Sequence, residues 1–450
     1  MVKEIQEPVD RTQGIPMNLI LRTYQAELKA RVRAAFAKGY RRVCLVLPPG
    51  GGKTAIFCSI AEDVDKRRKR AIILVHRRHL IHQAQRHLSE MGVKHGIIAP
   101  GYPMSNERIQ IASVQTLKNR IADIERPDMI ITDEAHHSTA RTWDFVLNRW
   151  HCWQLGVTAT PCRLDGRGLH THYDFLTQGP TVNELIGLGY LVRPTVYAPP
   201  IRADLSGLHI RAGDYNEEEI AERMDKPQIT GNAIEHYQRI CLGTRAVTFC
   251  STIEHGRHVA EAFNASGIPS ALFAGDICRQ ERDAILAGLE KGTVRNLVSV
   301  EMISEGTDIP SVETAIMLRP TASLGLFIQQ AGRAMRPAPG KKTAYILDHV
   351  GNCLRLKTLP TDDQFWTLDG DIKKEAKGKK LAIKVCPQCN AVVPINSPTC
   401  NSCGSVLVVP NAPINTVNGK LVEVESDGGM SRRALNKIYR KLEMYAWISD

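Results

Sequence analysis

The 450-residue sequence contains no run of 18 or more apolar residues, which argues against a membrane-spanning helix. Its first ten residues, MVKEIQEPVD, include no apolar segment of the kind that a secretory signal peptide needs. No internal repeat is visible in the sequence. We therefore expect a cytoplasmic protein with no membrane partner, associated with the nucleoid if the source is bacterial.

Signs of secretion are absent, so the twelve cysteines are not expected to form a disulfide framework. Eight are scattered singly and are interpreted as reduced core residues. The remaining four follow a C-x₂-C-x₁₀-C-x₂-C pattern at Cys386, Cys389, Cys400 and Cys403. Two such pairs can form a tetrahedral thiolate cage, so the pattern predicts a structural Zn²⁺ site, with disulfides as the alternative. This zinc module could contact DNA, a protein partner or only the rest of the chain.

Acidic residues are in the minority, because 58 Lys and Arg stand against 47 Asp and Glu, a formal net charge of +11. This balance favours a polyanionic partner, although many soluble proteins are basic for no specific reason. Two basic stretches, DKRRKR (65–70) and the lysine-rich DIKKEAKGKKLAIK (371–384), could follow a phosphate backbone. Either stretch could equally be a solvated surface segment.

One glycine is missing from an otherwise recognisable phosphate-binding loop in LVLPPGGGKTAI (45–56), where Leu47 occupies the first glycine position. The stretch joins an apolar strand to a helical pattern, the context that a phosphate loop requires. Backbone N–H groups at the glycines and the helix N-terminus would face the phosphates, a lysine would reach the outer phosphates, and a threonine would hold Mg²⁺. The alternative is an ordinary strand-to-helix turn. The predicted nucleotide-binding residues are Pro49, Gly50, Gly51, Gly52, Lys53 and Thr54.

A second candidate site lies about eighty residues further on, where the apolar run 129–132 ends in Asp133 and Glu134. Two adjacent carboxylates at the end of a parallel strand can divide the work of phosphoryl transfer. Asp133 would hold Mg²⁺, and Glu134 would polarise the attacking water. Taken alone, the pair could be only a charged strand end.

Together, PPGGGKT and DEAH resemble motifs I and II of superfamily 2 helicases and translocases, in which the first glycine of the loop is commonly replaced. LRTYQ (21–25) resembles the adenine-reading Q motif, which implies base contacts by Gln25 and its neighbour Arg22. The stretches 74–83 and 111–117 resemble motifs Ia and Ib. GVTATP (156–161) resembles motif III. The resemblance implies that Thr158, Thr160 and His136 couple hydrolysis to movement.

The second half of the chain alternates strand-like runs at 245–250, 296–300, 313–318 and 343–348 with helical patterns, which predicts another parallel α/β unit. FCST (249–252) and SEGTDIP (304–310) resemble motifs IV and V, which implies that Gly306 and Asp308 approach the ribose.

QQAGRAMRP (329–337) resembles motif VI. Arg333 and Arg336 are three residues apart and share one helix face, from which they could reach a γ-phosphate held by the first unit, while Gln329 helps to place water. A basic solvated helix face would explain neither the glutamine nor the glycine of this pattern.

The stretches 181–194 and 318–352 narrow the resemblance to bacterial RadD-type DNA repair helicases and, more loosely, to restriction-enzyme translocase subunits. The expected fold is α/β, with two tandem RecA-like parallel-sheet domains and a small C-terminal zinc-ribbon-like module. The expected divisions are a tail (1–18), domain 1 (19–197), a linker (198–230), domain 2 (231–355), a basic linker (356–384), the zinc module (385–409) and a tail with a terminal helix (410–450).

The expected activity is that of a nucleic-acid-dependent ATPase that moves on DNA, single-stranded or branched, in repair, recombination or replication. Its expected cofactors are ATP, Mg²⁺ and structural Zn²⁺. An RNA-directed helicase is the first alternative, and a nucleic-acid-binding adaptor with a weak motor is the second. The zinc module or the C-terminal tail could also bind a protein partner.

Overall fold

The computed structural model describes residues 20–162, 167–199, 205, 207–211, 214–225, 227–275, 277–300, 309, 312–369 and 383–407. The expected N-terminal tail, the terminal helix, Gly306 and Asp308 lie outside these residues. Within the described part, no helix combines the length and the apolar character that crossing a bilayer requires.

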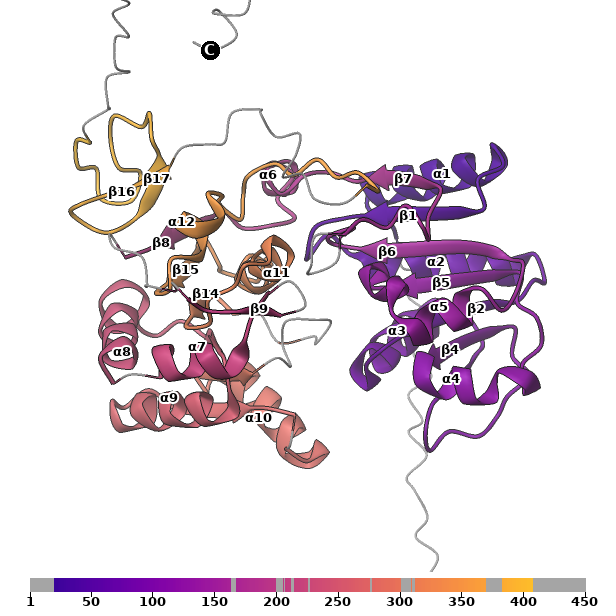
Figure 1. The fold of residues 1–450 in the computed structure, drawn as a ribbon, viewed down its shortest axis with the longest axis horizontal. Helices are drawn as coiled ribbons and strands as arrows, with labels where there is room; N and C mark the ends of the chain where they lie inside the picture. The colour runs from indigo at the N-terminus through magenta and orange to yellow at the C-terminus, as the bar shows by residue number, and fades with distance from the viewer. Residues whose placement is uncertain are drawn as a thin grey trace, which may run out of the picture. The chain divides into compact units, whose positions relative to one another are not determined.

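The first lobe is built on a seven-stranded, wholly parallel sheet in the order β3-β4-β2-β5-β6-β1-β7 (Figure 1). Because the carboxyl ends of parallel strands share one edge, the loops after β1, β5 and β6 are brought together there. The strands are β1 (Arg42–Val46), β2 (Ala71–Val75), β3 (His95–Ile98), β4 (Ile109–Ser113), β5 (Met129–Asp133), β6 (Trp153–Thr158) and β7 (Phe175–Gln178).

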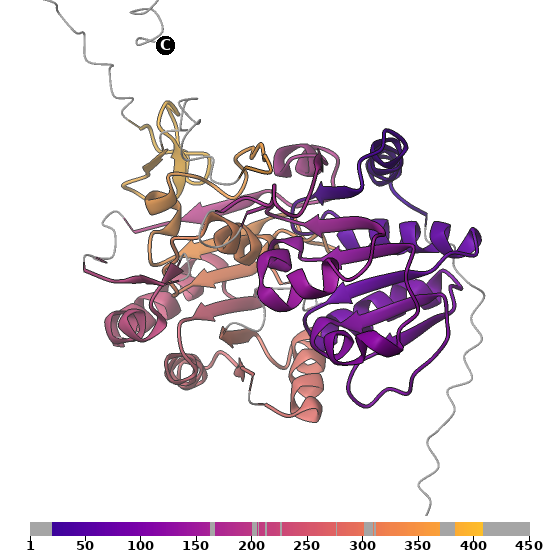
Figure 2. The same cartoon turned by 45° about the vertical axis from the view of Figure 1, so that its right-hand side comes forward.

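Helices cover both faces of this sheet (Figure 2). Alternate residues of β2 face opposite layers: Ala71, Ile73 and Val75 join the core under α1, α2 and α3, whereas Ile72 and Leu74 join a separate core under α4 and α5. Burial on both faces explains why the strands are continuous apolar runs. The helical elements are α1 (Thr23–Ala37), α2 (Lys53–Lys66), α3 (Arg78–Glu90), α4 (Val114–Arg120), η1 (Ile121–Asp123), η2 (Ala135–Thr139), α5 (Arg141–Leu147) and α6 (Val182–Gly187).

The second lobe repeats the design with a six-stranded parallel sheet in the order β12-β13-β11-β14-β15-β8. The two-sheet fold that the sequence predicts is therefore confirmed. The strands are β8 (Pro194–Tyr197), β11 (Ala246–Cys250), β12 (Ser270–Phe273), β13 (Asn296–Val300), β14 (Thr314–Met317) and β15 (Ala344–Asp348), and the helices are α7 (Glu217–Met224), α8 (Pro227–Cys241), α9 (Ile253–Ala265), α10 (Arg279–Lys291), α11 (Leu324–Ala334) and α12 (Asn352–Leu356).

The structure differs from the predicted divisions around residue 197. The predicted domain 1 (19–197) includes β8, but this strand pairs in parallel with β15 at the edge of the second sheet. The predicted linker 198–230 contains the short hairpin of β9 (Ile210–Arg211) and β10 (Asp214–Tyr215), the helix α7 and the start of α8. A four-residue strand whose partner lies some 150 positions away leaves no local sequence signal, which explains the error.

The segment after α12, residues 358–368, returns to the first lobe and is named here the return segment. It follows the edge strand β7, where the Gln178 side chain donates to the Gln364 carbonyl at 2.6 Å and accepts the Trp366 N–H at 3.0 Å. The N–H groups of Leu169 and His170 donate to the Leu368 carbonyl. Part of the predicted basic linker is therefore ordered structure that ties the end of the second lobe to the first.

The cysteine-rich module contains an antiparallel pair, β16 (Ile383–Val385) and β17 (Val392–Pro394). It contacts the edge strand β8 through a bridge between Tyr197 and Ala391. Next to that bridge the Tyr197 hydroxyl lies 3.0 Å from the Ser402 hydroxyl. The module thus extends the exposed edge of the second sheet.

Candidate nucleotide-binding site

The glycine-rich loop between β1 and α2 has a conformation that explains its unusual sequence. Leu47, at the position of the missing glycine, is fully buried, and its N–H donates to the Thr158 carbonyl at 3.0 Å. A Cβ at Gly51 would lie 2.6 Å from the Leu47 side chain. Leu47 therefore fills the underside of the loop, and glycine is required at 51 instead.

The same loop presents a helix N-terminus that lacks a side-chain cap. Gly50 and Gly52 have φ angles of 81° and 80°, in the left-handed region that favours glycine. Gly52 caps α2 without a side-chain hydrogen bond, so the first N–H groups of this 14-residue helix are available to an anion. Lys53 begins the helix, and its Nζ lies 3.7 Å from Glu134 Oε1. The two predicted catalytic segments therefore meet at one edge of the sheet.

Asp133 and Glu134 are both buried where β5 ends. Glu134 has φ 51° and ψ 58°, a left-handed conformation that is rare for a non-glycine residue and typical of functional sites. Its N–H donates to Asp133 Oδ1 at 3.0 Å. Burial, and next the neighbouring Glu134 carboxylate, raise the pKa of Asp133 to about 7, while Lys53 opposes the shift.

The residues at this edge fit a magnesium–nucleotide complex. Within the described residues, the buried Glu134 Oε2 accepts no hydrogen bond. A buried carboxylate oxygen without a donor is costly unless a water or ion completes it. The glycine cradle, the Lys53 ammonium and the Thr54 hydroxyl position supply the complementary anion site.

The predicted coupling residues are in contact with one another. The His136 ring lies between the Glu134 carboxylate and β6: its Nδ1 is 3.5 Å from Glu134 Oε2 and 3.2 Å from Thr158 Oγ1. Thr158 Oγ1 in turn donates to the Thr160 carbonyl at 2.9 Å. A Cβ at Gly325 of α11 would lie 3.0 Å from Thr160 Oγ1. A continuous series of contacts therefore runs from the carboxylate to the second lobe.

The predicted base-reading segment lies at the start of α1 and holds the glycine-rich loop. Gln25 Oε1 accepts the Arg22 N–H at 2.9 Å, and Gln25 Nε2 donates to the Gly51 carbonyl at 3.1 Å. The Tyr24 hydroxyl donates to the same carbonyl at 2.7 Å. The side-chain amide of Gln25 thus links the backbone at Arg22 directly to the phosphate loop.

Helix α11, which carries Gln329 and Arg333, packs against the glycine-rich loop. The helix ends at Ala334, so Arg336 lies just beyond it and does not share a helix face with Arg333 as predicted. A Cβ at Gly332 would lie 2.7 Å from Pro49 Cβ, and a Cβ at Gly50 would lie 3.7 Å from Arg336 Cγ. Gln329 and Arg333 are buried. The helix expected to act across the cleft is therefore in contact with the loop that would hold the phosphates.

A lysine that the sequence analysis did not single out fixes the end of this helix. Lys341 Nζ donates to the carbonyls of Val312, Ala334 and Arg336, the first and last at 2.7 Å. Burial lowers the pKa of Lys341 to about 8. Tyr24, described above, and Tyr190, described below, were also not predicted from the sequence. Tyr24 stands inside LRTYQ, so its position next to Gln25 was a usable signal. Tyr190 and Lys341 lie inside the stretches 181–194 and 318–352, which support the family resemblance but do not indicate these contacts.

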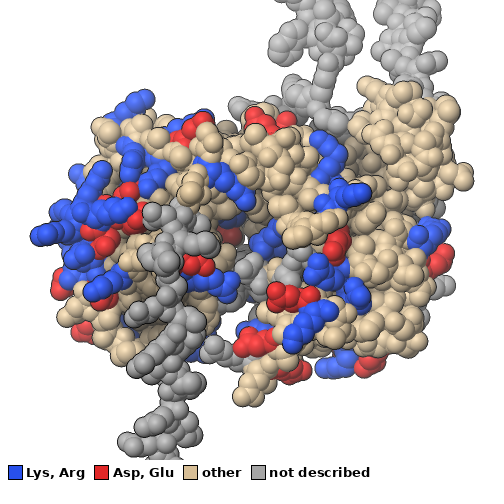
Figure 3. All heavy atoms as spheres, turned by 180° about the vertical axis from the view of Figure 1, so that it is seen from behind, with Lys and Arg blue, Asp and Glu red and all other residues tan. Residues whose placement is uncertain are grey.

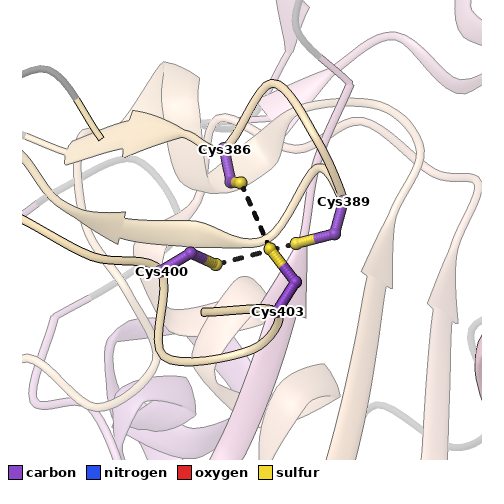
Figure 4. Close-up of side chains that lie close together, drawn as sticks. All are labelled: Cys386, Cys389, Cys400 and Cys403. Atoms are coloured by element: carbon purple, nitrogen blue, oxygen red, sulfur yellow. Dashed lines mark hydrogen bonds between the residues drawn. The ribbon is translucent and has the colours of Figure 1, made fainter. Parts of the chain in front are cut away.

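The four predicted metal ligands come together in the C-terminal module (Figure 4). The sulfur atoms of Cys386 and Cys403 are 3.7 Å apart, and those of Cys389 and Cys400 are 3.6 Å apart. Tetrahedral thiolates at about 2.3 Å from Zn²⁺ would be separated by roughly 3.8 Å, whereas a disulfide needs about 2.05 Å. The four thiols are free, so this geometry fits a metal and not the alternative disulfides.

Lysine and arginine are frequent on the surface of the first lobe (Figure 3). In the turn after α2, however, much of this charge is paired. Lys66 contacts Glu62, Lys69 contacts Asp128 at 3.3 Å, and Arg70 contacts Glu125. These pairs favour the interpretation of the turn 65–70 as a solvated, ion-paired surface.

Known proteins resemble both lobes. A family model described as the res subunit of type III restriction enzymes matches residues 18–163, and the helicase conserved C-terminal domain matches residues 232–338. A 51.5 kDa protein of a Lactococcus phage is 32% identical over 79% of this chain and 76% of its own length. A Saccharomyces cerevisiae protein that carries the name of an ATP-dependent helicase, IRC3, is 28% identical over 74% of this chain, which spans about half (52%) of the yeast protein.

A solved structure gives the same picture at the level of fold. The ATP-dependent type ISP restriction-modification enzyme LlaBIII bound to DNA matches with a TM-score of 0.56 at 19% identity, over 73% of this chain and 28% of that one. At this identity the likeness is one of fold.

Proposed function

Since this chain belongs to the superfamily 2 helicases, with relatives among the restriction-enzyme translocases, we propose that it is a DNA translocase that hydrolyses ATP between its two lobes. The observation that carries the proposal is the contact of α11 with the glycine-rich loop, at Gly332 and Pro49. Groups from both halves of the chain would then act on one triphosphate.

The residues of the first lobe would bind the nucleotide and direct the attacking water. Lys53 and the N-terminus of α2 would hold the phosphates, and Thr54 and Asp133 would hold Mg²⁺. When bound, Mg²⁺ supplies neutralisation of phosphate charge. Glu134, whose Oε2 accepts no hydrogen bond within the described residues, would orient the water and accept its proton.

The residues of α11 and Arg336, which lies just after it, would complete the site from the second lobe. Arg333 and Arg336 would stabilise the charge that develops on the transferred phosphoryl group, a contribution on the order of 10³–10⁵ in rate for related reactions. Gln329 would help to place the water. The contacts from His136 through Thr158 and Thr160 to Gly325 give a route by which hydrolysis could displace α11.

DNA is proposed over RNA because the family matching the first lobe is a restriction-enzyme subunit and the LlaBIII structure is of a complex with DNA. The resemblance to RadD-type enzymes supports a place in repair, recombination or replication. We also propose that the four-cysteine cluster holds a structural Zn²⁺, supported by its sulfur spacings. A module of this size gains most of its folding free energy from the metal.

The test is the ATPase rate titrated with single-stranded, duplex and forked DNA and with RNA of matched sequence. We expect DNA to stimulate ATP turnover. Lys53→Ala and Glu134→Gln should each lower the DNA-stimulated ATPase rate by a factor of about 10²–10⁴. Equal or greater stimulation by RNA would move the assignment to an RNA-directed enzyme. Unchanged turnover in both variants would reject the site, and tight DNA binding without turnover would favour the adaptor alternative.

A further inference from the structure

The connector between the lobes, residues 188–193, makes three consecutive contacts with three different parts of the nucleotide site. It leaves α6 of the first lobe and enters β8 of the second. The Tyr190 ring lies under the Arg22 guanidinium, whose central carbon is 4.1 Å from the ring centroid. A Cβ at Gly50 would lie 2.8 Å from Leu191 Cδ2. The Val192 N–H donates to the Met335 carbonyl, at the end of α11, at 2.8 Å.

The contacts of Tyr190 and Tyr24 determine the orientation of the Arg22 guanidinium. Arg22 Nη1 donates to the Tyr24 hydroxyl at 3.2 Å, and the rings of Tyr24 and Tyr190 are 5.3 Å apart. A planar guanidinium that lies on an aromatic ring is held in one orientation by cation–π attraction. Its other face can stack on a second flat group, and a nucleotide base is such a group.

We propose that Tyr190 is a positioning residue for ATP: it holds Arg22 flat against the adenine ring and, through the connector, links base binding to the placement of α11. The proposal rests on the proposed ATPase function. Arg22 is the group that would touch the base, whereas Tyr190 would act through it. The specificity would be for a triphosphate that carries a base, since Tyr190 contacts Arg22, the group that would touch the base, whereas the neighbouring Leu191 lies next to the glycine-rich loop at Gly50.

Placement of α11 follows from the short length of this path. Tyr190 and Val192 are separated by one residue. A shift of the Tyr190 ring would therefore also move the Val192 N–H that donates to the Met335 carbonyl. Met335 directly follows α11 and precedes Arg336. An empty base site would leave Arg22 and Tyr190 less constrained, and the end of the arginine-bearing helix would be held less firmly.

The experiment compares Tyr190→Ala, Tyr190→Leu and Tyr190→Phe with the wild-type chain in DNA-stimulated ATPase assays. The phenylalanine variant keeps the ring, whereas leucine keeps apolar volume without it. Tyr40→Ala is the matched control, because Tyr40 also pairs with an aromatic ring, that of Phe175, but precedes β1 at the opposite edge of the sheet. Inorganic tripolyphosphate, as a competitive inhibitor, reports on the phosphate loop without a base.

We expect Tyr190→Ala and Tyr190→Leu to raise the KM for ATP about tenfold, while the inhibition constant of tripolyphosphate stays within twofold. Tyr190→Phe and Tyr40→Ala should resemble the wild type. An Arg22→Ala, Tyr190→Ala double variant should be no worse than Arg22→Ala alone, because both changes remove one interaction.

The possible outcomes separate this inference from the proposed function. A wild-type chain without ATPase activity would reject the proposed function itself. An active wild type with unchanged Tyr190→Ala and Tyr190→Leu variants would overturn the positioning role only. Equal weakening of ATP and tripolyphosphate would also overturn it, since that pattern indicates general damage to the loop. A phenylalanine variant as impaired as the alanine variant would show that the ring is not what matters.

Discussion

Glu134 is held in a left-handed backbone conformation at the end of β5, where an L-residue is disfavoured by about 1–3 kcal/mol. Neighbouring positions on this strand have no such strain. The strain aims a buried carboxylate at the site between Lys53 and His136. At this residue, function opposes stability.

This conflict gives a prediction at Glu134 itself. Glu134→Gly should abolish ATPase activity and yet raise the free energy of unfolding by about 1 kcal/mol, because glycine adopts positive φ without cost. Glu134→Gln should abolish activity with a smaller gain, since it removes a buried charge but keeps the strain. Thermal unfolding measured alongside the ATPase rate checks both. A glycine variant less stable than the glutamine variant would contradict the role of backbone strain.

Lys341 gives a second prediction at the residue scale, on pH. Its pKa is lowered from 10.5 to about 8 by burial, so between these values the unfolded chain binds more protons than the folded chain. The contribution of this amine to stability therefore rises as the pH increases from 8 to 10.5. The free energy of unfolding of the wild type minus that of Lys341→Met should grow over this range. The free energy of unfolding of Lys341→Arg minus that of Lys341→Met should not change with pH over this range, because the guanidinium remains charged.

At the scale of elements, α11 and the glycine-rich loop approach each other closely because Gly332 has no side chain. Gly332→Ala would place a methyl group 2.7 Å from the Pro49 ring, which cannot rotate away. The helix can relieve the clash by separating from the loop. We expect kcat to fall at least tenfold with a small loss of stability. Gly187→Ala is the control, since a Cβ there meets nothing within 4 Å. Equal activity of the two variants would argue against this contact in catalysis.

The cysteine module gives the second prediction at this scale. The purified chain should contain one Zn²⁺, and Cys386→Ser or a strong chelator should remove it. Loss of the metal should unfold the module and expose the β8 edge beside Tyr197, detectable as faster amide exchange in β8 than in the central strand β11. Retention of slow exchange in β8 after metal loss would show that the module folds without zinc.

At the scale of the whole molecule, the two lobes are tied together twice, by the connector and by the return segment. The net charge of +11 adds a long-range attraction for polyanions. The logarithm of the binding constant for single-stranded DNA should therefore fall linearly with the logarithm of the salt concentration. The slope should be about −0.7 for each phosphate contacted. Fluorescence anisotropy of a labelled strand, measured between about 50 and 200 mM salt, gives the slope. A slope near zero would contradict backbone-directed binding.

Most features that the sequence predicts, both motifs and strands, lie within short contiguous segments. The loop at 45–56, the carboxylates after 129–132 and the paired cysteines are local patterns whose chemistry depends on neighbours within a few residues. The strand runs of both lobes were visible because burial on both faces makes them continuously apolar. Those predictions agree with the elements observed at the same positions.

The sequence by itself determined the two α/β units, the order of the motifs and the spacing of the cysteines, since hydrophobic periodicity and side-chain chemistry act over short distances. Only the tertiary structure decided that β8 belongs to the second sheet, that the return segment follows β7, that Tyr190 lies on Arg22 and that Lys341 binds carbonyls at the end of α11. Most of these contacts join residues far apart in the chain, whereas Lys341 also binds carbonyls only five and seven positions away. Such contacts arise from how the whole chain packs, and a local pattern does not record them.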